Sequence, residues 1–271
     1  ALWYRRTIEV PSVWAGKKVL LHFDAIDNKA DIFINGEPVG THSGGYTSFS
    51  YDITRYAGGT IELTVKVCDP TDDTACCVPH GKQVSNPGGI WYTPVTGIWQ
   101  SVWMEAVPQS FIKDYNVTTD LDGTVKVDVD VEGDAQQVCV EILRPRIGYN
   151  PEKPAFCLFR RARAKVQTGQ TAILKVRRPK LWTPDRPYLY GMRIKLLKDG
   201  KVIDKVDAYT AIRTIGIKSD ESGVKRLALN DNILFQFGPL DQGWWPDGLY
   251  SAPTAEALAW DIEQTKALGF N

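Results

Sequence analysis

Short runs of alternating apolar and polar residues fill the first 108 residues of the chain. Residues 19–23, 30–34 and 61–67 follow the two-residue period of strands that bury one face. Asn35-Gly36 comes directly after the second of these runs, and this dipeptide favours a tight hairpin because both residues tolerate a positive φ. No helical period appears in this region. The pattern predicts a β-sandwich domain over residues 1–108.

A second set of strand-like runs follows from about residue 109 to residue 215. Residues 126–131 alternate strictly, and residues 137–143 form a longer apolar-rich run. Turn signals separate these runs, as at Leu121-Asp122-Gly123 and Lys198-Asp199-Gly200. A domain of about 100 residues with this spacing of short strands is typical of an immunoglobulin-like β-sandwich. We therefore predict an all-β chain up to residue 215.

The last segment, residues 216–271, has a different pattern. A loop rich in Gly, Pro and Trp runs to Pro253, and residues 254–268 then place apolar side chains at helical spacing. Thr254 is a suitable N-cap for this helix, and Gly269 is a suitable stop. Gly269-Phe270-Asn271 reads as the entry into another strand. This order of strand, loop, helix and strand predicts the start of a βα repeat.

Opposite charges balance along the chain. Its 271 residues include 32 Lys and Arg and 32 Asp and Glu, so the formal net charge is zero and the isoelectric point is near 7.0. Such a chain has no whole-molecule field that attracts phosphate backbones or anionic lipids. No run approaches the roughly 18 apolar residues that a membrane-spanning helix needs. We expect neither nucleic acid nor a membrane as a partner, whereas a homo-oligomer is compatible with the sequence.

The cysteines and histidines show no ligand spacing. The five cysteines are Cys68, Cys76, Cys77, Cys139 and Cys157. An odd number cannot pair completely within one chain, and the redox compartment stays open. The three histidines are His22, His42 and His80, which lack the spacing of a metal site or of a nucleophile and its base. Asp72 and Asp73 are a weak signal for calcium because a full set of oxygen ligands is missing. We expect no metal site and no cofactor.

Five stretches of the sequence resemble a known enzyme family. The most specific is residues 89–103, which read GIWYTPVTGIWQSVW. This stretch is similar to the N-terminal domain of glycoside hydrolase family 2, which includes β-galactosidases, β-glucuronidases and β-mannosidases. Residues 4–6, 33–36, 44–53 and 181–190 are also similar to this family, in the order that the family shows.

The resemblance implies a three-part layout. It consists of a jelly-roll, galactose-binding-like sandwich over residues 1–108, an immunoglobulin-like β-sandwich over residues 109–215 and the truncated start of a (β/α)8 barrel over residues 216–271. Residues 230–233 resemble the family's hairpin before the barrel, and residues 235–238 resemble its first barrel strand. Common family members continue with an Arg-Gly-Val-Asn-type run, whereas this chain reads Gly238-Pro239-Leu240-Asp241-Gln242. This departure leaves the identity of the sugar open.

The chemistry of the family requires residues beyond these three parts. Retaining glycosidases use two carboxyl groups about 5–5.5 Å apart. The resemblance implies that both are glutamates after middle and late barrel strands, and a complete barrel takes roughly 250 residues. We therefore assign no catalytic residue and expect no activity from this chain alone.

The expected function follows from the resemblance. The chain is expected to be the non-catalytic N-terminal part of a retaining β-glycosidase that hydrolyses terminal O-glycosidic bonds in carbohydrate metabolism, with β-galactosides as the first candidate. The full-length protein is expected to bind a carbohydrate substrate. A periplasmic or secreted location fits the resemblance.

Candidate substrate-binding residues follow the presumed first barrel strand. They are Asp241, Trp244, Trp245 and Asp247. Barrels bind substrate at the end of the strands where these residues lie, and aromatic faces there stack on sugar rings beside carboxylates that accept hydrogen bonds. In the alternative interpretation, Trp244 and Trp245 pack the loop onto the second sandwich and Asp241 caps a turn.

A polar loop region of the first domain is a further candidate. It comprises residues 69–73, 82–83 and 88–92, and the resemblance implies that such a loop reaches toward the active site in some relatives. The alternative is a solvated loop, with Trp91 and Trp99 as core aromatics. The rival function is a stand-alone carbohydrate-binding or scaffolding module. The helix over residues 254–268 argues against this rival, since a free-standing module has no use for the start of a βα repeat.

Overall fold

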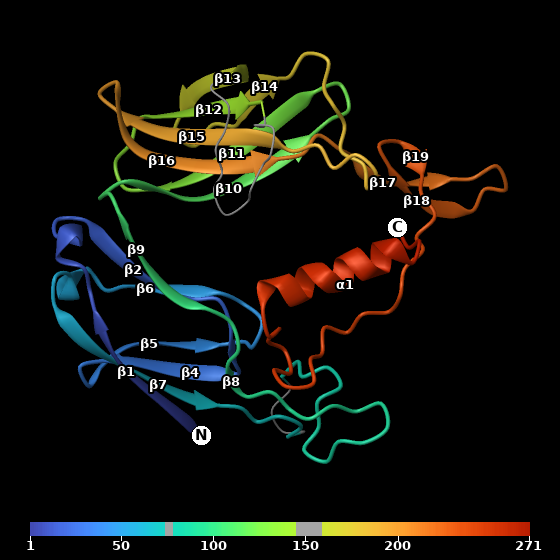
Figure 1. The fold of residues 1–271 in the computed structure, drawn as a ribbon. Coiled ribbons are helices and arrows are strands. Elements are labelled where there is room, and N and C mark those ends of the chain that lie inside the picture. Colours follow the sequence, from blue (N-terminus) through green and yellow to red (C-terminus); the bar gives the residue numbers. More distant parts are fainter. Residues whose placement is uncertain (74–77, 145–158) are drawn as a thin grey trace. The chain divides into compact units, whose positions relative to one another are not determined.

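A computed structural model describes residues 1–73, 78–144 and 159–271 (Figure 1). This part of the chain divides into two compact units. The first unit comprises Ala1–Val107 and Leu240–Leu268, and the second comprises Pro108–Pro239 and Gly269–Asn271. Strands predominate in both units, and the described residues contain a single α-helix. The expectation of an all-β chain is confirmed.

The first unit contains two antiparallel sheets. The strand order of the larger sheet is β1 (Leu2–Glu9), β7 (Thr60–Cys68), β4 (Lys29–Ile34) and β5 (Glu37–Ser43). The smaller sheet has the order β6 (Phe49–Asp52), β2 (Lys18–Phe23) and β9 (Val102–Val107). A short pair joins β3 (Ile26–Asp27) to β8 (Gly97–Ile98), and 3₁₀ turns cover Ser12–Trp14 and Thr54–Tyr56.

Alternation in the sequence produces the core of this sandwich. Every second residue of β7 is buried, from Ile61 to Val67, while the residues between them stay partly exposed. β2 alternates in the same way and buries Leu21 and Phe23 completely. Successive side chains of a strand point to opposite faces, so each strand contributes one apolar row to the space between the sheets.

The second unit contains another sandwich and a small sheet. One sheet has the order β13 (Arg160–Gln167), β12 (Gln137–Leu143), β15 (Tyr190–Lys198) and β16 (Lys201–Thr210). The facing sheet has the order β10 (Phe111–Thr119), β11 (Thr124–Glu132) and β14 (Ala172–Lys175). The small sheet consists of β17 (Ile215–Ser219), β18 (Lys225–Leu229) and β19 (Asn232–Ile233).

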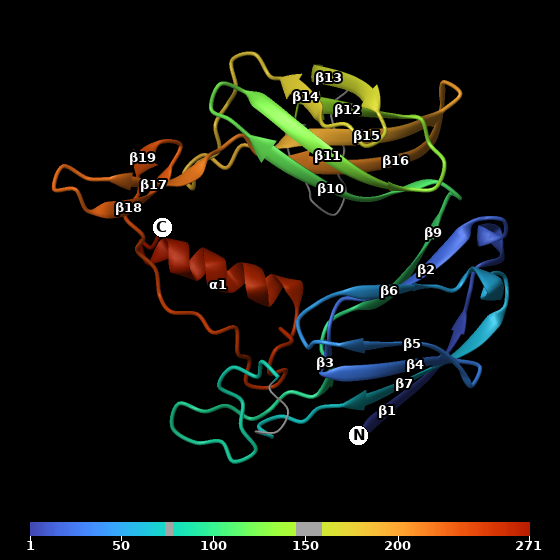
Figure 2. The ribbon, with the colours of Figure 1, turned by 180° about the vertical axis from the view of Figure 1, so that it is seen from behind.

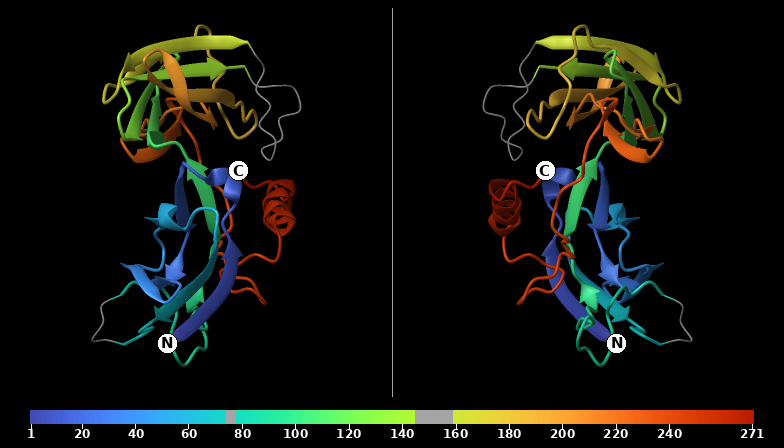
Figure 3. Two further views of the ribbon diagram at one scale, coloured as in Figure 1. Left: turned by 90° about the vertical axis from the view of Figure 1, so that its left-hand side faces the viewer. Right: turned by 90° about the vertical axis from the view of Figure 1, so that its right-hand side faces the viewer.

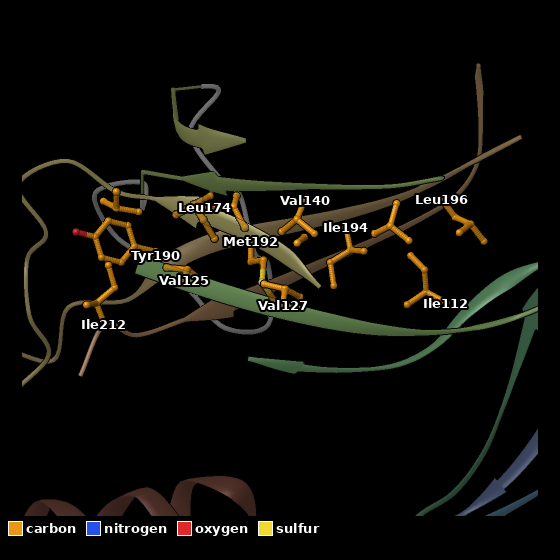
Figure 4. Close-up of a cluster of buried hydrophobic side chains, with 14 residues drawn as sticks. Ile112, Val125, Val127, Val140, Leu174, Tyr190, Met192, Ile194, Leu196 and Ile212 are labelled. Atoms are coloured by element: carbon orange, nitrogen blue, oxygen red, sulfur yellow. The ribbon is translucent and has the colours of Figure 1, made fainter. Parts of the chain in front are cut away.

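The core of the second sandwich forms around β15. Met192, Ile194 and Leu196 from this strand are completely buried; in Figure 4 Met192 and Ile194 lie near Val127 of β11, and Leu196 lies near Ile112 of β10. On the other face of the sheet, the buried carboxylate of Glu141 accepts hydrogen bonds from Lys195 Nζ at 2.7 Å and Arg160 at 3.2 Å. These partners compensate the loss of hydration of the charge.

Two-residue turns close the predicted hairpins. Asn35 and Gly36 have φ of 52° and 81° between β4 and β5. Asp199 and Gly200 have φ of 50° and 75° between β15 and β16. Positive φ at both central residues matches the twist of the flanking strands, which is why these dipeptides recur in hairpins. Both sequence predictions are confirmed.

The predicted helix is α1 (Ala255–Ala267). Thr254 caps it, since its hydroxyl oxygen accepts a hydrogen bond from the Ala257 N–H at 3.1 Å. None of the helical residues is buried, and Trp260 and Ile262 are 60% and 70% exposed. Figure 3 shows α1 standing off from the strands of the first unit. The helix therefore depends on its own hydrogen bonds and cap rather than on a packed face.

Residues 235–238, which are expected to be the first barrel strand, form no strand in the described part of the chain, and the barrel assignment stays a prediction. Phe237 instead exchanges two hydrogen bonds of 2.9 Å with Asn271, one through the Asn271 backbone and one through its side chain. The rings of Phe237 and Phe270 also lie 4.8 Å apart. A strand in a parallel sheet is held by regular ladder bonds to its neighbours, and the described chain provides this segment with only a short contact.

Candidate functional site

The candidate residues lie on a loop whose own hydrogen bonds define its shape. Asp241 caps a turn, because its carboxylate accepts a hydrogen bond from the Gly243 N–H at 2.7 Å. The backbones of Trp245 and Leu249 exchange hydrogen bonds of 2.8 and 3.0 Å. These bonds enclose a turn that carries Asp247 at an exposed position. The loop is therefore two consecutive turns rather than an extended connection.

A groove of about 320 Å³ lies between this loop and α1. Its lining consists of Asp241, Gly243, Trp244, Trp245, Pro246, Leu258, Asp261 and Ile262. Three of the four candidate residues are thus together, whereas Asp247 lies outside the lining. The volume is at the lower end of the range of about 300–1,000 Å³ for small-molecule sites. One sugar ring is the size of ligand that such a groove accommodates.

Trp244 packs on the first domain. Its ring stacks on Tyr92 with centroids 4.6 Å apart and an interplanar angle of 13°. The Tyr92 hydroxyl donates a hydrogen bond to the Gln242 side chain at 2.7 Å. Figures 1 and 2 show the polar loop after β7 side by side with the loop before α1. The part of the alternative interpretation in which Asp241 caps a turn is confirmed.

Tyr250 joins the same aromatic cluster. Its ring centroid lies 5.1 Å from that of Trp99 and 5.2 Å from that of Trp244. Trp99 is itself fixed by a hydrogen bond of 2.8 Å from its Nε1 to the Gly45 carbonyl. Ser251 donates to the Trp99 carbonyl at 2.9 Å. Trp91, in contrast, is exposed, so its interpretation as a core aromatic is wrong.

Gln83 is the polar centre of this cluster. It is 2% exposed, and its Nε2 donates toward the hydroxyls of Tyr250 at 3.1 Å and Tyr46 at 3.3 Å. Its Oε1 accepts a hydrogen bond from the Val95 N–H. Sequence reasoning placed Gln83 in a polar loop without a role of its own. No local pattern separates a buried glutamine from a solvated one in such a loop.

A buried acid lies beneath the cluster. Asp27 is 4% exposed, and burial, reinforced by the negative charge of Asp69, raises its pKa to about 6. A Cβ at Gly45 would lie 2.5 Å from the Asp27 carboxylate, so the absence of a side chain permits this approach. Burial also raises the pKa of the Tyr46 hydroxyl, together with its hydrogen bond to Tyr250. This region is therefore poorly hydrated.

The other polar candidates have structural partners. Asp72 accepts hydrogen bonds from the backbone and hydroxyl of Ser85 at 2.9 and 2.6 Å. These bonds lower the pKa of its carboxyl group. Among the described residues, no three His, Cys, Asp or Glu side chains are grouped so that they could hold a metal ion. Within the same residues no helix has the length and apolar character to cross a membrane.

The cysteines and histidines contribute no further site in this part of the chain. Cys68 is exposed and Cys139 is buried, and both are free thiols. Cys76, Cys77 and Cys157 lie outside the described residues. The histidines have packing roles, since His22 stacks on Trp103 and His42 on Phe49, each with centroids 4.0 Å apart. His80 hydrogen-bonds the Gln83 carbonyl at 2.8 Å.

Family models cover both sandwiches. Residues 1–108 match the sugar binding domain of glycosyl hydrolases family 2, and residues 110–213 match a second model described as glycosyl hydrolases family 2. The chain belongs to glycosyl hydrolase family 2. The resemblance drawn from the sequence motifs is thereby confirmed.

Several family 2 enzymes are similar to this chain. A β-galactosidase of Thermoanaerobacter pseudethanolicus is 28% identical over 80% of the chain and 29% of its own length. A putative β-glucuronidase of Formosa agariphila is 27% identical over 99% of the chain and 24% of its own length. The structure of a β-glucuronidase from Ruminococcus gnavus has a TM-score of 0.79 at 24% identity, covering 99% of this chain and 45% of that one. The chain thus spans less than half of each of these family 2 proteins.

Proposed function

We propose that this chain is the non-catalytic front part of a retaining β-glycosidase whose aromatic loop forms one wall of a sugar subsite. Membership of glycosyl hydrolase family 2 supports the reaction class. The observation that carries the subsite is the groove in which Asp241, Trp244 and Trp245 come together. Aromatic faces with adjacent carboxylates suit sugars, because a sugar has apolar C–H faces and a rim of hydroxyls.

The domain layout is part of this proposal. Residues 1–108 form the jelly-roll domain, residues 109–215 the immunoglobulin-like domain, and residues 216–271 the first βα segment of a (β/α)8 barrel. The contact of Phe237 with Asn271 supports the last assignment, since it joins the segments before and after α1. The catalytic carboxyl pair is then supplied by later parts of the barrel.

The charge of the groove favours a neutral sugar. Two carboxylates, Asp241 and Asp261, belong to its lining, and no Lys or Arg does. A uronate would bring a third negative charge into this space, whereas the hydroxyls of a galactoside can donate to the carboxylates. β-Galactosides are therefore the first substrate class, and β-glucuronides are the rival.

Aryl β-D-galactosides and aryl β-D-glucuronides test the proposal directly. The full-length protein is expected to hydrolyse the galactoside with the higher kcat/KM and to retain the anomeric configuration. The 271-residue chain is expected to bind without turnover. Activity of this chain, after contaminating enzyme has been removed, would contradict the assignment of the carboxyl pair to later strands.

Two substitutions test the groove. Trp244→Ala is expected to raise KM about tenfold, equivalent to about 1.4 kcal/mol, because it removes an aromatic face on which the apolar C–H face of a sugar can stack. Asp241→Asn is expected to narrow the preference for galactoside over glucuronide, since it removes one repelling charge. Trp3→Ala is the matched control, because this tryptophan is 62% exposed on the first sheet and lies outside the groove. Equal changes in KM for Trp244→Ala and Trp3→Ala would contradict the assignment of the groove as a sugar subsite.

A further inference from the structure

The loop before α1 is attached to the first domain at both of its ends, and one residue belongs to both attachments. The side chain of Gln83 reaches Tyr250 near the end of the loop. Its backbone pairs with Tyr92, whose ring and hydroxyl contact Trp244 and Gln242 near the start of the loop. We propose that Gln83 is the positioning residue that sets this loop and thereby the Trp244 face. The role of Gln83 in holding the loop is argued from the structure alone. Its effect on sugar binding rests on the proposed function.

The partners of the Gln83 amide fix its orientation. The Val95 N–H can only donate, so it must face Oε1. Nε2 then faces the His80 carbonyl at 3.1 Å and the hydroxyls of Tyr46 and Tyr250. The carbonyl can only accept, which requires a donor at this position. The amide is an uncharged side chain of this length that provides both an acceptor for Val95 and two N–H donors, which the His80 carbonyl and the two tyrosine hydroxyls share.

The backbone link transmits this position to Trp244. Tyr92 donates its N–H to the Lys82 carbonyl at 2.9 Å and accepts from the Val84 N–H at 3.2 Å. These bonds bracket Gln83 and hold Tyr92 beside it. Because the Tyr92 ring stacks on Trp244, a shift of the segment around Gln83 moves the aromatic face that lines the groove.

Loss of the amide leaves the Val95 N–H without its acceptor and removes one partner each from the His80 carbonyl and from the Tyr46 and Tyr250 hydroxyls. Gln83 is buried, so water cannot replace its hydrogen bonds without opening the cluster. Methionine has a similar length but neither a strong donor nor a strong acceptor. Gln83→Met is therefore expected to release the loop while it preserves the volume. Gln83→Glu keeps the acceptor for Val95 but places a second acceptor against the His80 carbonyl.

Amide hydrogen exchange of the 271-residue chain measures the positioning without any sugar. In Gln83→Met, exchange over residues 242–251 is expected to accelerate at least about tenfold, because these amides become free to open locally. The Trp245 and Leu249 amides, which bond each other's carbonyls, are the most informative. Gln264→Met, on the exposed surface of α1, is the matched control and is expected to change nothing there. Unchanged exchange in Gln83→Met with an intact unfolding transition would overturn the proposal.

The glutamate variant separates positioning from general damage to the fold. At pH 7.5 its carboxylate has no proton to donate, whereas at pH 5 a larger fraction is protonated and one donor returns. The quantity compared is the amide exchange rate of the variant divided by that of the unsubstituted chain at the same pH. For Gln83→Glu this ratio is therefore expected to be at least about threefold lower at pH 5 than at pH 7.5. Gln83→Met is expected to show no such recovery. Identical pH behaviour of the two variants would overturn the proposal even if the methionine variant folds poorly.

Kinetics of the full-length protein test the consequence for the sugar. Gln83→Met is expected to raise KM for an aryl β-D-galactoside about fivefold and to leave kcat within about twofold, since the binding wall moves while the reacting groups do not. A released loop with an unchanged KM would overturn the link to the substrate. Failure of the unsubstituted protein to hydrolyse any aryl β-glycoside would instead overturn the proposed function, and the exchange result would stand.

Discussion

The second sandwich buries its apolar side chains, whereas the C-terminal segment leaves similar side chains exposed. Ile194 in β15 is completely buried, whereas Ile262 in α1 is 70% exposed. Both residues belong to regular secondary structure with an apolar pattern. The difference in their exposure shows that the apolar period of the sequence predicts whether a segment forms a strand or a helix. Whether its apolar side chains are buried depends on whether another element packs against them.

The loop before α1 differs from both of these regions. It contains no strand or helix, yet its position is set by Gln83, Tyr92 and Trp99 of the first domain. A few hydrogen bonds and ring contacts therefore order a segment that the hydrophobic effect alone would leave loose. The adjacent helix α1 has regular secondary structure, but none of its residues is buried.

The largest expected effect compares two isoleucines. Ile194→Ala leaves a cavity between the sheets and is expected to lower the free energy of unfolding by about 2–5 kcal/mol. Ile262→Ala removes mostly hydrated surface and is expected to change it by less than about 0.5 kcal/mol. Urea unfolding of the two variants measures both values. Similar losses in both would mean that α1 is covered in solution.

A smaller effect concerns the acid beneath the aromatic cluster. The pKa of Asp27 is about 6 in the folded chain and near 3.8 when unfolded, so the folded state binds its proton more tightly. Its contribution to stability is therefore complete below pH 4 and is lost as the pH rises through 6. The loss is expected to be on the order of 3 kcal/mol, because each pKa unit corresponds to about 1.4 kcal/mol.

Asp27→Asn isolates this contribution. The amide does not titrate, so the difference in stability between this variant and the unsubstituted chain is expected to grow in favour of the variant from pH 4 to pH 7. Urea unfolding at several pH values provides the measurement. Exposed Asp185→Asn is the control and is expected to give a constant difference. A constant difference for Asp27→Asn as well would show that its carboxyl is hydrated.

The strands and turns could be predicted because their causes are local. The alternation over residues 61–67 became β7, and the dipeptides Asn35-Gly36 and Asp199-Gly200 became hairpin turns with positive φ. The cap at Thr254 was equally readable, since it depends on one side chain and the third N–H after it. The barrel strand expected over residues 235–238 stays a prediction, because a parallel strand depends on neighbours that are distant in sequence.

The candidate site could be predicted only in part. Asp241, Trp244 and Trp245 were found because their residue types suit sugar binding and they follow a recognisable segment. Gln83 and Tyr92 belonged to the candidate polar loop but had no roles of their own, and Tyr250 was not assigned. Their meeting depends on contacts across about 150 residues of chain. The pattern of apolar and polar residues predicts which side of a strand or helix is apolar, but it does not predict which distant loop packs against that side.

The smallest expected effect concerns the cap of α1. A helix of 13 residues is marginal without tertiary packing, so the single hydrogen bond to Thr254 has a large share in its stability. Thr254→Ala is expected to cost about 1 kcal/mol of local helix stability, and Thr254→Ser, which retains the oxygen, only a few tenths. Amide exchange over residues 257–264 is expected to accelerate in the alanine variant, while the urea midpoint of the sandwiches stays constant because α1 buries no residue of its own. A shift of that midpoint would contradict the separation of helix from sandwich, and with it the conclusion that α1 is stabilised from within.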